Sequence, residues 1–260
     1  MGSVLLAYSG GVDSTFLLKA AADVLKDRVL AVTAVSPTYS NEELTFSKRM
    51  AKALKVRHKI IQTHELENKR FAMNPINRCY FCKKELFGRL KEMAARFNFN
   101  FVADASNISD RRDFRPGSKA KEELKIRSPL QEAGFTKDDI RLASKKLGLS
   151  TWDKPAMACL ASRVPYGKEI TSRILTQVNK AEALLKRLGF RQARLRHYNG
   201  TCRIEVFKED IPALIYKRDV IVRELKEMGY NYVTLDLEGY RMGSMNIPHL
   251  GAGKYKILQA

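Results

Sequence analysis

The first part of the chain alternates between strand-like and helix-like patterns of hydrophobic residues. Short runs of strand length cover residues 3–8, 29–36, 58–63 and 100–106. Apolar residues spaced three and four apart, as on one face of a helix, cover residues 14–25, 41–56, 80–97 and 136–149. Strands that alternate with helices predict an α/β fold with a doubly wound parallel sheet. In such a sheet, ligands bind at the carboxyl ends of the strands.

The pattern changes toward the end of the chain. Residues 152–167 contain two prolines and a glycine, which predicts an ordered loop that crosses between domains. Beyond this loop we expect a small α+β unit, with elements at residues 171–188, 191–198, 201–207, 209–228 and 232–238. The dipeptide Asn199-Gly200 is a strong signal for a two-residue hairpin between two of its strands. We therefore predict one domain over residues 1–165 and a smaller one over residues 166–260.

Local polar residues predict where some of the helices begin and end. Asn41 and Thr136 each precede a helical stretch and are candidate N-caps. Gly148 suits the carboxyl end of the later helix, because glycine adopts the left-handed conformation that often ends a helix. The polar segment 112–120 predicts a loop.

Composition adds a strong positive charge to this picture. The chain has 260 residues, 47 Lys and Arg against 28 Asp and Glu, and a formal net charge of +19. The basic residues are spread along the chain, so the charge fits either RNA binding or a solvated surface with an anionic small substrate. The sequence contains no run of 18 apolar residues, so we expect no membrane-spanning helix. The four cysteines do not resemble a secreted disulfide framework, and we expect a cytoplasmic protein without a membrane partner.

The most specific motif is AYSGGVDST at residues 7–15, between a predicted strand and a predicted helix. Gly10 and Gly11 let the backbone approach an anion, and the N–H groups at the start of the helix donate to it. Asp13 fits a magnesium ligand or an acid at the start of a helix. Hydroxyl groups are added by Ser9, Ser14 and Thr15. The motif is neither a Walker A loop, which needs a lysine before Ser or Thr, nor a GxGxxG loop. The simpler alternative is a glycine turn in an ordinary βαβ unit.

The Ser-Gly-Gly-x-Asp-Ser pattern resembles the PP-loop ATP pyrophosphatases. Members of this class bind ATP, transfer AMP to a substrate oxygen and release pyrophosphate. The resemblance implies that ATP and Mg²⁺ are held by Ser9, Gly10, Gly11, Asp13 and Ser14, with Asp13 also acting in catalysis. It also implies that the end of the second strand, at Ala34, Val35 and Ser36, borders the adenosine.

Four further segments resemble the LarE family of PP-loop enzymes. They are NPINRCYFCKKELFGRL at 74–90, ADASNISDRRDFRPG at 103–117, SPL at 128–130 and WDKPAMACLASRVPYG at 152–167. The resemblance implies an ATP-dependent sulfur transferase in nickel-pincer cofactor biosynthesis, which serves lactate racemase maturation. Its substrate is pyridinium-3,5-biscarboxylic acid mononucleotide, whose carboxylates are adenylylated and converted to thiocarboxylates. Ala105 and Ser106 stand where related enzymes often have Gly-Thr, and we expect little effect because both are small.

The family has two sulfur sources, and the number of cysteines in the sequence indicates which one applies. In one branch of the family, a cysteine at the position of Cys159 surrenders its own sulfur. In the other, three cysteines hold a [4Fe-4S] cluster whose fourth iron binds a hydrosulfide from a sulfide or another sulfur donor. Cys79, Cys82 and Cys159 match the second branch, because three thiolates leave one iron open. A redox pair or a zinc site remains an alternative for Cys79 and Cys82. Cys202 alternates with apolar residues in a strand and is predicted to be a core residue.

Charged residues in the last third are candidates for binding the substrate. Arg194 and Arg196 lie two apart in a strand, so they share the face opposite the apolar one. The alternative is a solvated strand face. The resemblance also implies that Arg194 and Arg196 bind the substrate, and that Glu182 and Glu205 are acidic site or metal-contact residues. Ser162 and Arg163, just after Cys159, are candidate contacts to the substrate phosphate. The resemblance implies a homo-oligomer as well. A PP-loop tRNA thiolase, with tRNA as its partner, is the competing interpretation, and it would explain the net charge as an RNA-binding surface.

Overall fold

The computed structural model describes residues 1–112, 115–155, 158–241 and 243–246. The chain divides into two compact units, Met1–Ala158 and Cys159–Ala260, which are described separately. The sequence prediction placed the boundary between residues 165 and 166, within the segment that opens the second unit. The predicted loops at 112–120 and 152–167 include residues 113–114 and 156–157, which lie outside the described residues.

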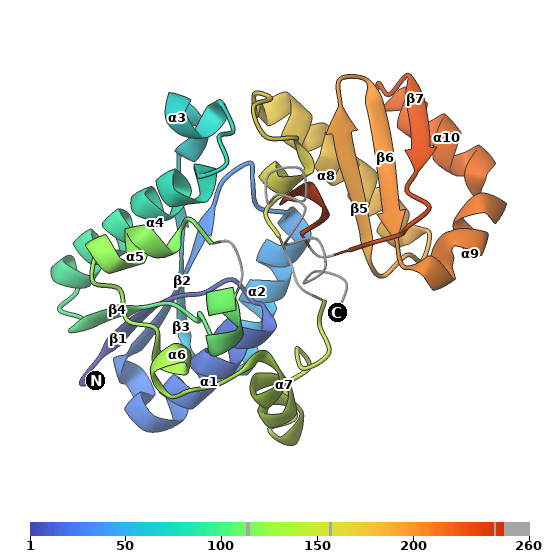
Figure 1. Cartoon of the computed structure of the whole chain (residues 1–260). Helices are drawn as coiled ribbons and strands as arrows, with labels where there is room; N and C mark the ends of the chain where they lie inside the picture. Colours follow the sequence, from blue (N-terminus) through green and yellow to red (C-terminus); the bar gives the residue numbers. More distant parts are fainter. Residues whose placement is uncertain (113–114, 156–157, 242, 247–260) are drawn as a thin grey trace. The chain divides into compact units, whose positions relative to one another are not determined.

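The first unit is built on a parallel sheet (Figure 1). Its described strands are β1 (Val4–Ala7), β2 (Val29–Val35), β3 (Arg57–Gln62) and β4 (Phe101–Ala103). They run in the order β3-β2-β1-β4, and each neighbouring pair is parallel. Ala103 makes a further parallel bridge to Arg127. The predicted α/β fold with a parallel sheet is confirmed.

Helices cover both faces of this sheet (Figure 1). They include α1 (Val12–Leu25), α2 (Asn41–Ala53), α4 (Arg78–Arg96) and α7 (Lys137–Lys146). Successive residues of a strand point to opposite faces. Leu6 of β1 accordingly belongs to a core with Phe16 and Ile140, from α1 and α7. Leu5 belongs to a second core with Phe87 and other residues of α4. The sheet is therefore sandwiched between α1 and α7 on one face and α4 on the other.

Shorter elements and caps refine the sequence predictions. Helices α3 (Lys69–Ala72), α5 (Ser118–Glu123) and α6 (Pro129–Glu132) lie between the longer ones, and α5 begins inside the predicted loop 112–120. The cap prediction at Asn41 was wrong, because Ser40 accepts the N–H of Glu43 and Asn41 is already helical. Thr136 caps α7 as predicted, in a capping box with Asp139.

The second unit contains a mixed sheet with strand order β5-β6-β7. Its strands are β5 (Ala193–Tyr198), β6 (Thr201–Val206) and β7 (Tyr232–Leu235). β5 and β6 form the predicted hairpin, in which Asn199 and Gly200 have φ values of 44° and 86°. Positive φ at both central residues is the signature of a type I′ turn. β7 then adds parallel to β6.

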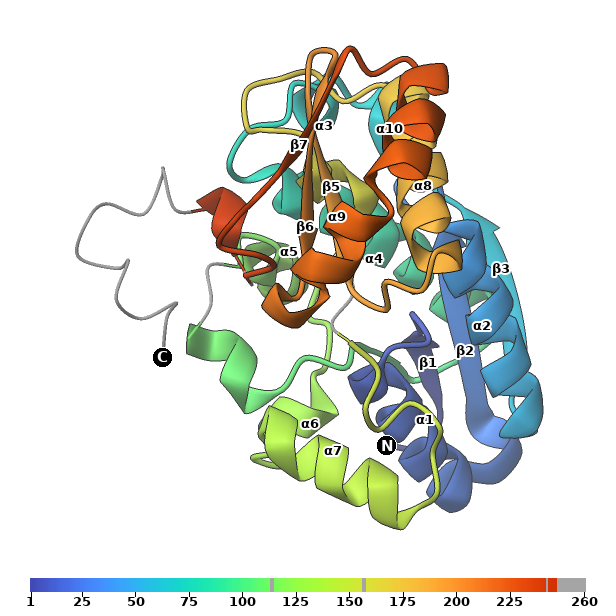
Figure 2. The ribbon, with the colours of Figure 1, turned by 90° about the vertical axis from the view of Figure 1, so that its right-hand side faces the viewer.

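The described residues of this second unit form three α-helices, namely α8 (Ser172–Arg187), α9 (Ile211–Tyr216) and α10 (Arg218–Glu227). The prediction of one helix over 209–228 was wrong. Lys217 ends α9 by donating its N–H back to Ala213 O, and α10 starts at the next residue. Gln177 Nε2, in α8, donates to Met228 O, directly after α10, at 2.9 Å (both helices are labelled in Figure 2).

Alternate residues of the β5–β6 hairpin build the apolar core of the second unit. Leu195 pairs with Ile204 and His197 with Cys202, so these four side chains share one face. Cys202 is fully buried there, which confirms it as a core residue. No helix in the described ranges is long and apolar enough to cross a membrane.

Candidate active site

The glycine-rich loop joins β1 to α1 at the carboxyl edge of the first sheet. Gly10 has φ +71°, and a Cβ on it would lie 3.0 Å from Ser47 Cβ of α2. The loop therefore needs glycine here for both conformation and space. Gly11 precedes α1 with extended backbone, and no described side chain caps the helix. The first N–H groups of α1 are thus available to an anion.

Hydrogen bonds of hydroxyl groups hold this loop, some within the loop and one from Tyr39 outside it. Ser9 Oγ lies 3.1 Å from Ser14 Oγ, and the N–H of Gly11 donates to Ser9 Oγ. Tyr39, just beyond β2, donates its hydroxyl to Ser9 O at 2.7 Å. The structure brings the predicted loop residues together, while their contact with a triphosphate remains a prediction.

Two lysines from distant segments contact the loop. Lys137 Nζ, at the start of α7, lies 2.7 and 2.9 Å from the two carboxylate oxygens of Asp13. Lys154 Nζ donates to Glu43 Oε2 at 2.7 Å and to Gly10 O at 3.2 Å. Both lysines were missed from the sequence because no local pattern connects them to the loop.

Just beyond the end of β2, two hydroxyl groups contact a buried carboxylate. Glu65 Oε1 accepts hydrogen bonds from Ser36 Oγ at 2.5 Å and from Thr38 Oγ1 at 2.8 Å. Glu65 is buried, and its Oε2 has no hydrogen-bond partner within the described part of the chain. Ala34 is the second-last residue of β2, two positions before Ser36. The predicted adenosine border at Ala34 and Ser36 is not tested, but Glu65 is a polar group there that the sequence did not reveal.

Two of the cysteines lie within the first five residues of α4. Cys79 and Cys82 are half-buried and three residues apart, a spacing that places side chains on one face of a helix. Cys159 is exposed, belongs to the second unit and precedes the short turn Leu160–Arg163. None of these cysteines is in a disulfide. Among the described residues, no three His, Cys, Asp or Glu side chains gather closely enough to hold a metal. The three-cysteine cluster therefore stays a prediction.

A buried Asp–Lys cluster lies at the end of β4. Asp104 accepts hydrogen bonds from Ser106 Oγ at 2.7 Å and Ser128 Oγ at 2.6 Å. Lys121 Nζ lies 3.3 Å from Asp104, and Lys83 Nζ of α4 lies 4.0 Å away. Burial alone would raise the pKa of Asp104, but the two lysines and two hydroxyls hold it below its ordinary value. Ser106 thus supplies the hydroxyl that a threonine would supply at this position.

The second unit holds Arg163 against Glu182. Arg163 Nε and Nη2 donate to the two carboxylate oxygens at 2.8 and 2.9 Å, and both side chains are buried. The N–H of Leu195 also donates to Glu182 Oε1. Burial acts to raise the pKa of Glu182, but the charge and hydrogen bonds of Arg163 outweigh it and lower that pKa. Ser162 Oγ accepts from Arg163 Nη1, so the predicted Ser162, Arg163 and Glu182 lie together.

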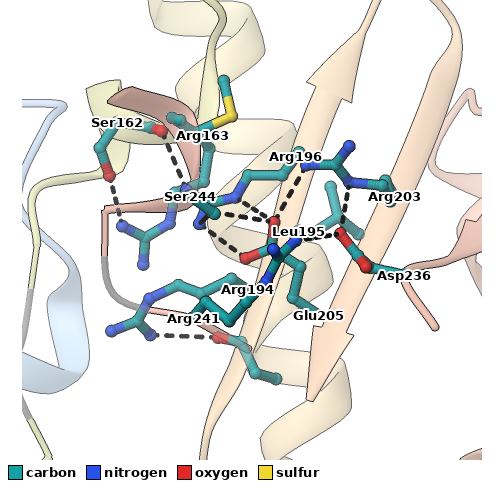
Figure 3. A network of polar contacts seen from close by, with 12 residues as sticks. Ser162, Arg163, Arg194, Leu195, Arg196, Arg203, Glu205, Asp236, Arg241 and Ser244 are labelled. Atoms are coloured by element: carbon teal, nitrogen blue, oxygen red, sulfur yellow. Dashed lines mark hydrogen bonds and ion pairs between the residues drawn. The ribbon is translucent and has the colours of Figure 1, made fainter. Parts of the chain in front are cut away.

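A second arginine network lies on the hairpin face opposite the apolar core (Figure 3). Arg196 donates to both carboxylate oxygens of Glu205 at 2.9 and 2.6 Å. Arg203 also reaches Glu205, at 3.2 Å. Arg194 is buried and stacks against Tyr240, and burial lowers its pKa. The alternative of a solvated strand face is wrong for Arg194, Arg196 and Glu205, while their contact with a substrate remains a prediction.

Comparisons with known proteins identify the family. The asparagine synthase family model matches residues 2–79, the part that contains the glycine-rich loop. The chain is 39% identical to the pyridinium-3,5-bisthiocarboxylic acid mononucleotide synthase of Lactiplantibacillus plantarum, over 94% of this chain and 88% of that protein. The chain belongs to the LarE family. It is also 46% identical to an uncharacterized protein of Synechocystis, over 93% of this chain and 91% of that one. A protein of Methanocaldococcus jannaschii is 29% identical over 92% and 90% of the two chains.

Membership of the LarE family confirms the resemblance drawn from the sequence motifs. As a PP-loop member of this family, the chain is an ATP-dependent enzyme. The loop from Ser9 to Ser14 lies at the carboxyl end of β1, and ligands of parallel α/β sheets bind at this edge. Lys137 and Lys154 contact this loop, and Glu65 contacts Ser36 just beyond β2. The motifs identified none of these three polar residues.

Proposed function

We propose that this chain adenylylates the carboxylates of pyridinium-3,5-biscarboxylic acid mononucleotide and converts them to thiocarboxylates. The product is the precursor of a nickel-pincer cofactor. The observation that carries the proposal is the 39% identity to the pyridinium-3,5-bisthiocarboxylic acid mononucleotide synthase, which extends over 94% of the chain. The match thus includes both units rather than the nucleotide loop alone.

The first chemical step is adenylylation. A substrate carboxylate oxygen attacks the α-phosphorus of ATP, the bond to the β-phosphate oxygen breaks, and pyrophosphate leaves. The N–H groups at the start of α1 support this step, because no described side chain caps them and they can donate to a phosphate. Asp13 carries a carboxylate beside the loop and would hold Mg²⁺, which neutralises phosphate charge.

The second step is thiolation. A hydrosulfide attacks the activated acyl carbon, AMP leaves with the bonding electrons, and a thiocarboxylate remains. We assign Cys79, Cys82 and Cys159 as ligands of a [4Fe-4S] cluster. The shared helix face of Cys79 and Cys82 fits two ligands of one cluster, and neither thiol is consumed in a disulfide. When bound, such a cluster would offer an open iron to hydrosulfide.

The second unit fits a role in binding the anionic substrate. Arg163 and Arg196 are each held in a fixed orientation by a buried carboxylate, Glu182 and Glu205 respectively. Preorganised guanidinium groups recognise phosphate and carboxylate with little loss of side-chain entropy. We propose that Arg194 joins them in contacting the substrate.

The activity is tested with purified protein under anaerobic conditions. The protein is mixed with Mg-ATP, the dicarboxylate mononucleotide and sulfide, and products are analysed by mass spectrometry. The expected result is AMP, pyrophosphate and exchange of oxygen for sulfur in the substrate. Asp13→Asn should abolish all three, whereas Asp23→Asn should not, because Asp23 is exposed on α1 and pairs with Lys19. Thiolation that needs no ATP would overturn the proposal.

One competing function, thiolation of tRNA, would explain the net charge of +19 as an RNA-binding surface. Under that function the purified protein retains tRNA, its affinity falls steeply with salt, and thionucleosides appear after incubation with ATP and sulfide. Under the proposed function, tRNA stays unmodified while the mononucleotide is thiolated.

A further inference from the structure

The nucleotide loop carries an ion pair that its own motif does not predict. Both carboxylate oxygens of Asp13 contact Lys137 Nζ, at 2.9 and 2.7 Å. The two residues are 124 positions apart in sequence. Asp13 is also the residue assigned to the magnesium ion of Mg-ATP. An ammonium group on both oxygens and a divalent cation compete for the same lone pairs.

This pair is more accessible than the other lysine pair at the loop. The Lys137 and Asp13 side chains are 31% and 25% exposed, against 14% and 10% for Lys154 and Glu43. Water and ions therefore reach the Asp13 carboxylate more readily. An accessible pair is weak in free energy, so an incoming ion can displace it at low cost.

Lys137 has a fixed backbone and a long side chain. Its N–H donates to Ser109 Oγ at 3.1 Å, and the preceding Thr136 caps α7 through a capping box. The Cα position is thus held by the helix start, while the four-carbon stem allows the ammonium group to change partner without moving the backbone.

The loop also lacks a charge that phosphate-binding loops commonly use. No lysine precedes its serine and threonine, in contrast to a Walker A motif. We propose that Lys137 is an exchangeable counter-ion. It neutralises Asp13 in the nucleotide-free protein and transfers to the triphosphate when a divalent cation takes the carboxylate. The inference rests on the ATP-dependent function proposed above for the identity of the incoming anion.

Removal of the Lys137 charge has two opposite consequences under this assignment. Lys137→Met should bind Mn²⁺ alone several-fold more tightly than the wild type, because the Asp13 carboxylate loses its competitor. The same variant should bind Mg-ATP about tenfold more weakly, because a phosphate contact is lost. A merely structural ion pair would not separate the two affinities in opposite directions.

The test measures Mn²⁺ binding by electron paramagnetic resonance and Mg-ATP binding by calorimetry on the full chain. Lys146→Met is the matched control, because it removes the same charge from an exposed position on α7 and should change neither affinity. Lys137→Arg keeps the positive charge and should retain most of the Mg-ATP affinity. It is the second test variant if Lys137→Met does not fold. Unchanged Mg-ATP binding in a folded Lys137→Met protein, or weaker Mn²⁺ binding, overturns the proposal. Absence of ATP binding to the wild type would instead overturn the proposed function.

Discussion

Arg163 and Glu182 form a two-pronged ion pair in the second unit, with nitrogen–oxygen distances of 2.8 and 2.9 Å and both side chains buried. The loss of one partner leaves the other charge buried and uncompensated. Arg163→Met should therefore lower the free energy of unfolding by about 3–5 kcal/mol. The exposed pair Arg218–Asp219 is the control, and Arg218→Met should cost less than about 1 kcal/mol. Denaturant unfolding of both variants measures the difference, and equal losses would contradict the account.

The same pair makes stability depend on pH in the acid range. Arg163 holds the pKa of Glu182 below its ordinary value in the folded state, despite the opposing effect of burial. Glu182 thus contributes stability that is fully present above the unfolded pKa, about 4.3, and is lost as the pH falls through the lower folded pKa. The free-energy gap between wild type and Glu182→Gln should be constant near neutral pH and shrink below about pH 4.3. A gap that widens with acid would refute this assignment.

Gly10 is expected to tolerate no side chain. Alanine there would combine a left-handed backbone, φ +71°, with a Cβ only 3.0 Å from Ser47 Cβ. Gly134→Ala is a matched control, since its φ of +78° imposes similar strain while a Cβ would meet nothing within 4 Å. Both variants should lose about 1–2 kcal/mol from backbone strain. Only Gly10→Ala should lose ATP binding, which calorimetry measures. Normal ATP affinity in Gly10→Ala would contradict the placement of the nucleotide at this loop.

The cysteines should differ sharply in reactivity. Burial raises the pKa of the Cys202 thiol to about 12, so almost no thiolate forms at neutral pH. Cys159 is exposed. In folded protein that carries no cluster, brief treatment with iodoacetamide should label Cys159, and it should label Cys202 only after unfolding. Peptide mass spectrometry gives both extents, and early labelling of Cys202 in the folded protein would be inconsistent with its place in the core.

Sequence reasoning succeeded where neighbouring residues determine the structure. The nine residues from Ala7 to Thr15 contain the last residue of β1, the two glycines of the loop and the start of α1. Asn199-Gly200 specifies its hairpin because both residues tolerate positive φ. Local signals were ambiguous where two neighbours suit the same role, as Ser40 and Asn41 do at the start of α2.

Sequence reasoning failed where distant segments meet. Lys137 and Lys154 reach the loop across 124 and 144 residues, and a lysine on a polar helix or loop looks like any solvated charge. The hairpin arginines were assigned to the correct face by alternation. Their burial against Glu205 depends on the folded register and on segments such as Ser244, which the alternation does not reveal.

The most direct test of the account counts the sulfur atoms transferred per chain. Anaerobically reconstituted protein is supplied with excess sulfide, Mg-ATP and the dicarboxylate mononucleotide, and thiocarboxylate product and the mass of the Cys159 peptide are measured together. The account expects more than one sulfur per chain, an intact Cys159, and single-turnover or no activity in Cys79→Ala and Cys82→Ala. At most one sulfur per chain, with Cys159 converted to dehydroalanine, would contradict the cluster, and no thiocarboxylate at all would contradict the proposed function.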